Sequence, residues 1–244
     1  MSVSQYLKDK LKRGTVHITL IDPMKQSPEA AARLALTAQE VGSDLILIAG
    51  LNGLSQRNLL ETTSAVKEKI SIPLVYSPAG GEALCFSFDA LFFSSLLNAK
   101  NPNYLCGGQA QAAIVVKRME IETIPVGYIV VEPGIKMGEL GSIELISRDN
   151  YWLAANYAVA AELFGMQFVY FETGLNAAQP IPAGMIRAVK KELSVPLIVG
   201  GGIRTAVDAR RVRQAGADMV VTGTIIENAG YRERLRSILS ALKD

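Results

Sequence analysis

The sequence has little cysteine, little histidine and no run of charge of one sign. Its two cysteines, Cys85 and Cys106, fit no spacing typical of a metal site or a redox pair. We therefore expect both to be reduced and buried, because free cysteine behaves as a small hydrophobe. With one histidine and no nucleophile-elbow motif, the chain does not resemble a triad hydrolase. We expect that histidine, His17, to be a hydrogen-bonded core residue rather than a catalytic base.

Charge and hydropathy exclude further classes of protein. There are 25 Lys and Arg against 23 Asp and Glu, a net charge of +2, with no basic stripe of the kind that binds nucleic acid. No apolar run approaches the ~18–20 residues of a membrane span. The N-terminal stretch MSVSQYLKDKLKRG is charged where a signal peptide is apolar. We expect a cytoplasmic protein with no transmembrane segment and no nucleic-acid partner.

What the chain has is alternation between short apolar runs and amphipathic stretches. Strands are predicted at Thr15–Ile21, Asp44–Ala49, Pro73–Tyr76, Asp89–Phe93, Thr123–Val131, Gln167–Phe171, Pro196–Gly200 and Asp218–Thr222. Helices are predicted at Pro28–Val41, Ser55–Lys69, Asn103–Arg118, Asp149–Gly165, Pro182–Leu193, Thr205–Ala215 and Tyr231–Leu242. Eight strand–helix steps in 244 residues predict an α/β fold: one TIM-type (β/α) barrel over residues 1–244.

One interval is too short for this pattern. Only 12 residues, SPAGGEALCFSF, separate the third and fourth predicted strands. A crossover helix with its two loops rarely fits into that length. We predict that the third outer helix is missing or reduced, which leaves either a covered loop or a gap in the barrel wall. Leu84, Phe86 and Phe88 would line such a gap and make it a groove for a long apolar ligand.

Two glycine-rich turns follow the last two strands. Strand seven ends in Gly200-Gly201-Gly202 and strand eight in Thr222-Gly223-Thr224. Glycine allows close backbone approach, and in TIM-type barrels the loops after strands seven and eight commonly bind phosphate. The pair of turns predicts a binding site for a phosphate ester without choosing a reaction.

Charged residues end two other strands at the same face of the barrel. Asp22 follows strand one and is suited to Mg²⁺, although Asp before Pro is also ordinary turn chemistry. Lys25 can meet a phosphate as a mobile charge. Glu172 ends strand six, where it can accept a proton from a hydroxyl group or cap the next helix.

These motifs resemble a known family. "HITLIDPMK", "SLLNAKNPNYLCGGQA", "GYIVVEPG", "SRDNYWLAANYAVAAELFGMQFVYFETG", "IVGGGIRT" and "GADMVVTGT" together look like geranylgeranylglyceryl phosphate synthase, the archaeal phosphoglycerol geranylgeranyltransferase, in its larger second subgroup. The resemblance covers almost the whole chain. It implies a barrel without its third helix and a reaction that joins sn-glycerol 1-phosphate to geranylgeranyl diphosphate, with release of pyrophosphate, in archaeal membrane phospholipid synthesis. It also implies homo-oligomers, dimers or hexamers, and transient contact with a membrane surface.

The resemblance also assigns roles to residues. Asp22 would bind Mg²⁺ with the prenyl diphosphate, Lys25 would neutralise charge, and Glu172 would act as the catalytic base. The glycerol phosphate would be held by Tyr170, Phe171, Glu172, Thr173, Gly174, Leu175, Asn176, Gly201, Gly202, Gly223 and Thr224. The chain departs from the family at Leu51, which stands where a hydroxyl residue is the usual second metal ligand. Two alternatives remain: a non-catalytic barrel that binds phosphate or lipid, and a barrel isomerase acting on a small phosphorylated metabolite.

Overall fold

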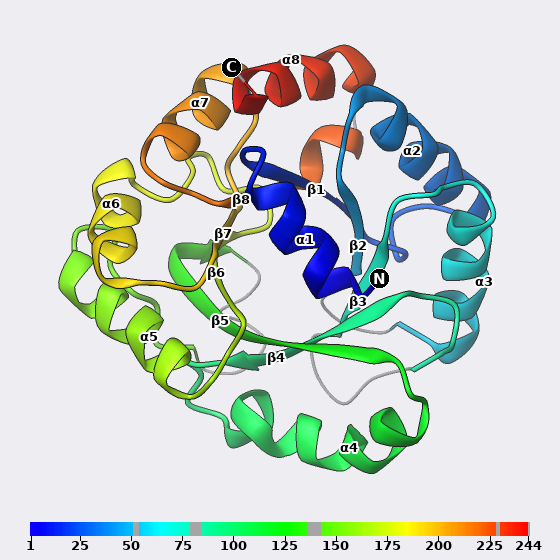
Figure 1. The fold of residues 1–244 in the computed structure, drawn as a ribbon, viewed down its shortest axis with the longest axis horizontal. Coiled ribbons are helices and arrows are strands. Elements are labelled where there is room, and N and C mark those ends of the chain that lie inside the picture. Colours follow the sequence, from blue (N-terminus) through cyan, green and yellow to red (C-terminus); the bar gives the residue numbers. More distant parts are fainter. Residues whose placement is uncertain (51–53, 79–83, 136–142, 228–229, 244) are drawn as a thin grey trace.

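The chain folds into a closed barrel of parallel strands surrounded by helices (Figure 1). The structure, a computed structural model, describes residues 1–50, 54–78, 84–135, 143–227 and 230–243. Each strand pairs in parallel with the next along the chain, and β1 closes the ring by pairing with β8. The strands are β1 (Val16–Ile21), β2 (Leu45–Ala49), β3 (Leu74–Ser77), β4 (Ala90–Leu96), β5 (Glu122–Ile135), β6 (Phe168–Gly174), β7 (Leu197–Gly200) and β8 (Met219–Thr222). The predicted barrel is confirmed.

The outer layer contains the seven predicted helices, with small shifts at their ends. They are α2 (Pro28–Val41), α3 (Gln56–Lys67), α4 (Gly108–Arg118), α5 (Tyr151–Leu163), α6 (Ala183–Glu192), α7 (Ala206–Gln214) and α8 (Tyr231–Lys243). A π-helical turn, η1 (Asn103–Gly107), precedes α4, and a short 3₁₀ helix, η2 (Thr224–Glu227), follows β8. Between β3 and β4 the described residues, 78 and 84–89, contain no helix, so the predicted loss of the third outer helix holds for them.

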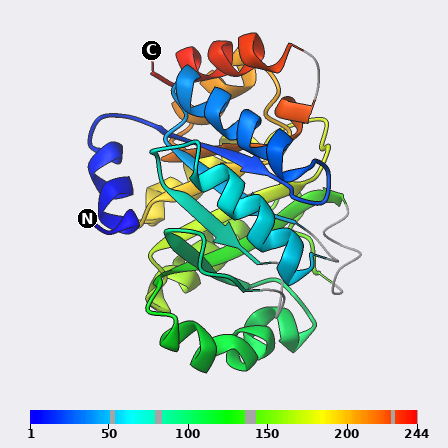
Figure 2. The same ribbon diagram turned by 90° about the vertical axis from the view of Figure 1, so that its right-hand side faces the viewer.

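An additional helix, α1 (Val3–Leu11), was not predicted and covers one end of the barrel (Figures 1 and 2). Its Val3 and Leu7 are buried among the side chains that fill the barrel interior. The Glu122 carboxylate at the start of β5 accepts hydrogen bonds from the backbone N–H groups of Val3 and Ser4. A carboxylate at a helix N-terminus is favourable for the helix dipole. The strand beginnings are therefore closed, and any substrate must enter at the strands' carboxyl ends.

Side chains alternate between the barrel interior and the surrounding helices. Leu47 and Val75 pack inside the barrel with α1, whereas Ile48 and Tyr76 join the core beneath the outer helices. This period of two is expected of barrel strands. It determines which residues at the carboxyl ends of the strands can reach the mouth.

Three aspartates hold the beginnings of neighbouring strands together in the same way. Each accepts a hydrogen bond from a backbone N–H near the start of the preceding strand: Asp44 from His17 (3.0 Å), Asp89 from Leu74 (2.8 Å) and Asp218 from Leu197 (2.7 Å). A lysine pairs with each carboxylate, namely Lys10, Lys67 and Lys190. These aspartates therefore set strand register at the closed end of the barrel, far from the mouth.

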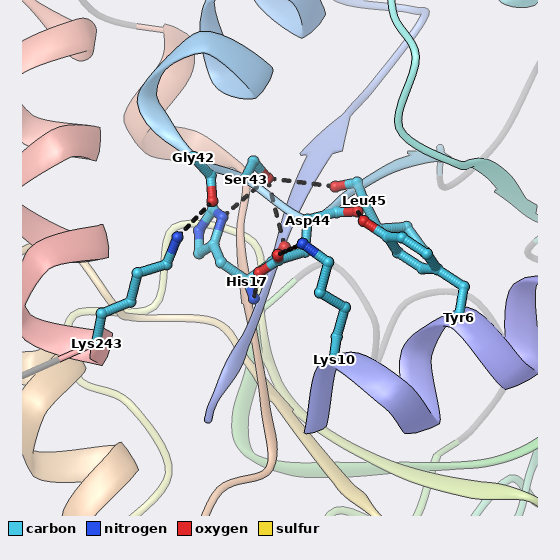
Figure 3. A network of polar contacts seen from close by, with 8 residues as sticks. All are labelled: Tyr6, Lys10, His17, Gly42, Ser43, Asp44, Leu45 and Lys243. Atoms are coloured by element: carbon cyan, nitrogen blue, oxygen red, sulfur yellow. Dashed lines mark hydrogen bonds and ion pairs between the residues drawn. The ribbon is translucent and has the colours of Figure 1, made fainter. Parts of the chain in front are cut away.

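His17 is a core residue, as predicted, and lies between the barrel and α2 (Figure 3). Its Nδ1 is 3.0 Å from Ser43 Oγ, and its Nε2 is 3.0 Å from Thr222 Oγ1. Burial lowers the pKa of His17 to about 4, against the opposing effect of Asp44. The imidazole is therefore neutral in the folded protein at neutral pH.

Of the two cysteines, Cys85 is buried as expected, but Cys106 is exposed because η1 turns it towards solvent.

The buried His17 predicts acid sensitivity of the fold. Its pKa of about 4 in the folded state lies below the usual 6.5, so the unfolded chain binds the proton more tightly. The free energy of unfolding is therefore highest above pH 6.5 and decreases as the pH falls towards 4. This one group accounts for a decrease of about 3 kcal/mol. Urea unfolding between pH 4 and 7 measures the loss, and His17→Gln should show a shallower pH dependence. Equal pH dependence in both proteins would contradict this account.

Candidate active site

A largely apolar cavity of about 110 Å³ opens at the carboxyl ends of the strands. Asp22, after β1, stands at one side of it, and Glu172, near the end of β6, stands at the other. Between them the lining is mostly apolar and aromatic, with Leu96, Tyr128 and Tyr170 among its residues. The structure thus brings together the two carboxylates that the sequence placed at strand ends.

Glu172 is held rigidly although it is almost fully buried. Its Oε1 accepts a hydrogen bond from the Gly174 N–H at 2.8 Å, and its Oε2 accepts one from the Tyr170 hydroxyl at 3.0 Å. Burial raises the pKa of Glu172, and these two hydrogen bonds oppose the rise. The side chain is therefore more basic than an exposed glutamate and is fixed in one orientation, which suits a general base.

The glycines that end β7 make room for this carboxylate. A Cβ on Gly200 would lie 2.5 Å from the Tyr170 hydroxyl and 2.7 Å from Glu172 Oε2. On Gly201, whose φ is +80°, a Cβ would lie 2.2 Å from both Glu172 Oε1 and Thr173 Oγ1. Glycine is therefore required at these two positions by the neighbouring side chains of the protein, whether or not a ligand binds. These clashes alone do not support the predicted phosphate site.

A second, smaller pocket lies beside the first and is suited to a phosphate. It is lined by Gly174, Asn176, Gly201, Gly202, Gly223 and Thr224, all of them predicted glycerol-phosphate residues. Glu172, Leu20 and Leu175 line both pockets. The two glycine turns after β7 and β8 therefore face one small space, where backbone amides are suited to an anion. Glu172 stands at its boundary with the larger cavity.

Arg204 also lines the small pocket, and sequence reasoning missed it. Its Nη2 donates a hydrogen bond to the backbone carbonyl of Asn176 at 3.0 Å. Asn176 has a φ of +60°, a conformation that a non-glycine residue rarely adopts. Arg204 thus fastens the β6 loop to the β7 loop and places a guanidinium at the rim of an anion pocket. The sequence did contain a signal for this role, because Arg204 is only two residues after the glycines that were predicted to bind phosphate.

Not every predicted residue faces a pocket. Phe171 is fully buried among the side chains between the sheet and the helices, because it alternates with the inward-facing Tyr170 and Glu172. Thr173 is buried as well, and its Oγ1 has no hydrogen-bond partner among the described residues. Lys25 is exposed, and its backbone N–H donates to the Asp22 carbonyl. Lys25 is not among the residues that line the cavity beside Asp22.

The Asp22 side of the cavity carries little charge. Asp22 Oδ1 accepts the N–H of Met24 at 3.0 Å, and Gly50 packs against the carboxylate. Among the described residues no three His, Cys, Asp or Glu side chains gather as a metal site. Leu51, which the sequence analysis noted at the position of the usual second metal ligand, lies outside the described residues. A lone carboxylate fits Mg²⁺, which keeps several waters and is commonly bound through substrate phosphates.

Sequence reasoning also missed Tyr128, whose ring lies 4.7 Å from that of Tyr170 inside the cavity. Its burial and the nearby Glu172 raise the pKa of Tyr128 well above its usual range, so the hydroxyl stays protonated. The alternation of β5, with Ile124 and Val126 also facing inward, was a signal that predicts this placement.

A barrel that places a buried carboxylate between an anion pocket and an apolar cavity belongs to the TIM-type enzymes that act on phosphorylated molecules. The family model described as the PcrB family matches residues 6–242. The chain therefore belongs to the PcrB family.

Relatives of known activity cover nearly the whole chain. The geranylgeranylglyceryl phosphate synthase of Thermococcus gammatolerans is 43% identical over 240 residues, 98% of this chain and 95% of that protein. That of Thermoplasma acidophilum is 40% identical over 245 residues, 100% of this chain and 97% of that protein. The crystal structure of the Thermoplasma acidophilum enzyme in complex with its substrate sn-glycerol-1-phosphate matches with a TM-score of 0.97 at 41% identity, covering 100% of this chain and 99% of that one. The resemblance predicted from the sequence motifs is confirmed.

The glycine at the end of β7 can be tested directly. Gly200→Ala inserts a methyl group within 2.7 Å of both Tyr170 Oη and Glu172 Oε2. Crowding of this kind costs about 1–3 kcal/mol, and we expect that loss in the free energy of unfolding. Urea denaturation measures it. A variant as stable as the wild type would show that β7 does not need glycine to accommodate Glu172.

Proposed function

We propose that the chain is a geranylgeranylglyceryl phosphate synthase, a prenyltransferase of archaeal ether-lipid synthesis. It joins sn-glycerol 1-phosphate to geranylgeranyl diphosphate and releases pyrophosphate. The observation that carries this proposal is the position of Glu172, which lines both the anion pocket and the apolar cavity. A base at that boundary can touch the acceptor's hydroxyl on one side while the reactive end of a prenyl chain lies on the other.

The acceptor occupies the small pocket. The backbone amides of Gly201, Gly202 and Gly223, with Thr224, bind its phosphate, and the β6 segment from Tyr170 to Asn176 surrounds the glycerol. The identity of 41% to an enzyme crystallised with sn-glycerol-1-phosphate supports this assignment. The phosphate thereby fixes the distance between the anion pocket and the hydroxyl group that reacts.

In the transfer step the bond between prenyl C1 and the diphosphate oxygen breaks, and pyrophosphate leaves with the electron pair. The acceptor's 3-hydroxyl oxygen forms the new bond to C1, and its proton passes to a carboxylate oxygen of Glu172. The rigid hydrogen bonds from Gly174 and Tyr170 hold that carboxylate in place before the substrates arrive. Fixed positions for both reactants supply much of the acceleration.

The donor occupies the larger cavity. Asp22 would hold Mg²⁺, which would supply positive charge to the leaving diphosphate. Lys25 does not line the cavity, but it is exposed and three residues after Asp22, so its flexible side chain can add positive charge there. The prenyl tail runs past Pro78, Ser94 and Gln109, which the cavity shares with an apolar pocket between β4 and α4.

This tail site lies beside the connection between β3 and β4, whose described residues contain no helix. Leu84 lines it as expected from the sequence. Phe88 is instead buried against Tyr76, with ring centroids 5.5 Å apart, and Phe86 is 74% exposed. A prenyl donor needs an apolar site of this kind, whereas an isomerase of small phosphorylated metabolites does not, so the apolar lining of this pocket supports the transferase.

We also propose a homo-oligomer, a dimer or hexamer, and transient contact with the membrane surface that holds donor and product. No described helix is both long and apolar enough to span a bilayer. Trp152 and Leu163 of α5 and the following residue, Phe164, are each at least 74% exposed, and exposed apolar side chains of this kind support self-association. Light scattering should give a mass of two or six chains, and a monomer would contradict the proposal.

Turnover with labelled sn-glycerol 1-phosphate and geranylgeranyl diphosphate tests the function. We expect an ether product whose formation requires Mg²⁺ and stops with a chelator. Glu172→Gln keeps the shape of the side chain but removes the base, so turnover should fall by about 10²–10⁴-fold. Calorimetry should show that this variant still binds the acceptor. Near-normal turnover would exclude Glu172 as the base, and no product from the wild type would exclude the function.

The hydrogen bond from Tyr170 predicts a shift in the pH profile. This bond lowers the pKa of Glu172, so its removal in Tyr170→Phe should raise that pKa further. Because a base works when deprotonated, the acid limb of kcat/KM should move to higher pH. Tyr128→Phe is the matched control, since Tyr128 makes no hydrogen bond to Glu172 and should leave the limb in place. Equal shifts in both variants would contradict the assignment.

A further inference from the structure

Among the described residues, the end of β2 offers no polar side chain to a ligand bound beside Asp22. Ala49 and Gly50 line the cavity there, and a Cβ on Gly50 would lie 3.2 Å from Asp22 Oδ1. The strand next to Asp22 therefore contributes only a methyl group and bare backbone among the residues described. A diphosphate accepts hydrogen bonds, and the Asp22 carboxylate has no donor to offer it, so donors must come from other groups of the cavity wall.

Ser77, the last residue of β3, is placed to supply one. It is in register with Ala49, and both line the cavity. Val75, two residues earlier, packs inside the barrel, so alternation turns Ser77 to the same side. Within the described part of the chain no other group forms a hydrogen bond with the Ser77 hydroxyl.

The other hydroxyl in this wall is less available. Ser94 Oγ lies 3.5 Å from the backbone carbonyl of Phe92, and the carbonyl of Ser94 accepts a hydrogen bond from Gln109. Ser94 is thus tied to its own strand and to α4. Of these two serines, Ser77 is the one whose hydroxyl has no such hydrogen bond among the described residues.

We propose that the Ser77 hydroxyl donates a hydrogen bond to the diphosphate of the prenyl donor. This inference rests on the proposed function. Neighbouring strands are about 4.8 Å apart, so β1 and β3 stand roughly 10 Å apart, a gap that a diphosphate and its cation can bridge. Asp22 and Ser77 then hold the diphosphate from opposite sides. The bond strengthens as negative charge develops on the leaving pyrophosphate.

Equilibrium binding of inorganic pyrophosphate in the presence of Mg²⁺ tests this without turnover. In calorimetry, Ser77→Ala should weaken pyrophosphate binding by about tenfold or more, the loss expected for one hydrogen bond to a charged group. Ser77→Thr keeps the hydroxyl and should restore most of the affinity. Binding of sn-glycerol 1-phosphate should be unchanged in both, which shows that the anion pocket is intact.

Ser87→Ala is the matched control. Ser87 lies in the same connection between β3 and β4, accepts a hydrogen bond from Ser64 and lines neither pocket of the site. Pyrophosphate binding that is equal in Ser77→Ala and wild type would overturn the proposal for Ser77. Turnover by the wild type decides the proposed function separately, so the two can fail independently.

Discussion

Burial of a carboxylate at the mouth of the barrel is the constraint on which the site depends. An ionised group removed from water is costly unless hydrogen bonds replace its hydration. Here the Gly174 N–H and the Tyr170 hydroxyl do so, and they also fix the direction of Glu172. The same burial requires β7 to end without side chains, because Gly200 and Gly201 lie against the carboxylate. Burial of this one carboxylate thus explains why Tyr170 stands beside it on β6 and why glycines end β7.

Around Glu172 the barrel separates two kinds of surface. The loops after β6, β7 and β8 present glycine backbone and Arg204 to a small anion pocket. The side of β3, β4 and α4 presents apolar side chains, because the helix that would cover β3 is missing from the described residues. At the opposite end, α1 and the aspartates hold the strands together. Stability and chemistry are therefore placed at different ends of the barrel, so loops at the mouth can vary without loss of the closed end.

Much of this fold could be predicted because local signals were strong. The helix α2 has both of its predicted ends, since Ser27 caps it, Pro28 begins it and Gly42 ends it at a φ of +108°. The helix α1 was missed although local signals were present, since Ser2 caps it and its buried Val3 and Leu7 are one turn apart. The close contact between Glu172 and the glycines at the end of β7 could not be predicted from the sequence either, because it joins residues that are far apart in the chain. Phe171 was grouped with the pocket residues and lies in the core beneath the helices, since a motif carries no account of which face each residue occupies.

The most direct test of the central claim is a crystal structure of this protein with sn-glycerol 1-phosphate. Our account predicts the phosphate against the turns at Gly201, Gly202 and Gly223, with the 3-hydroxyl within hydrogen-bond distance of Glu172. A phosphate bound elsewhere, or a hydroxyl directed away from Glu172, would contradict it.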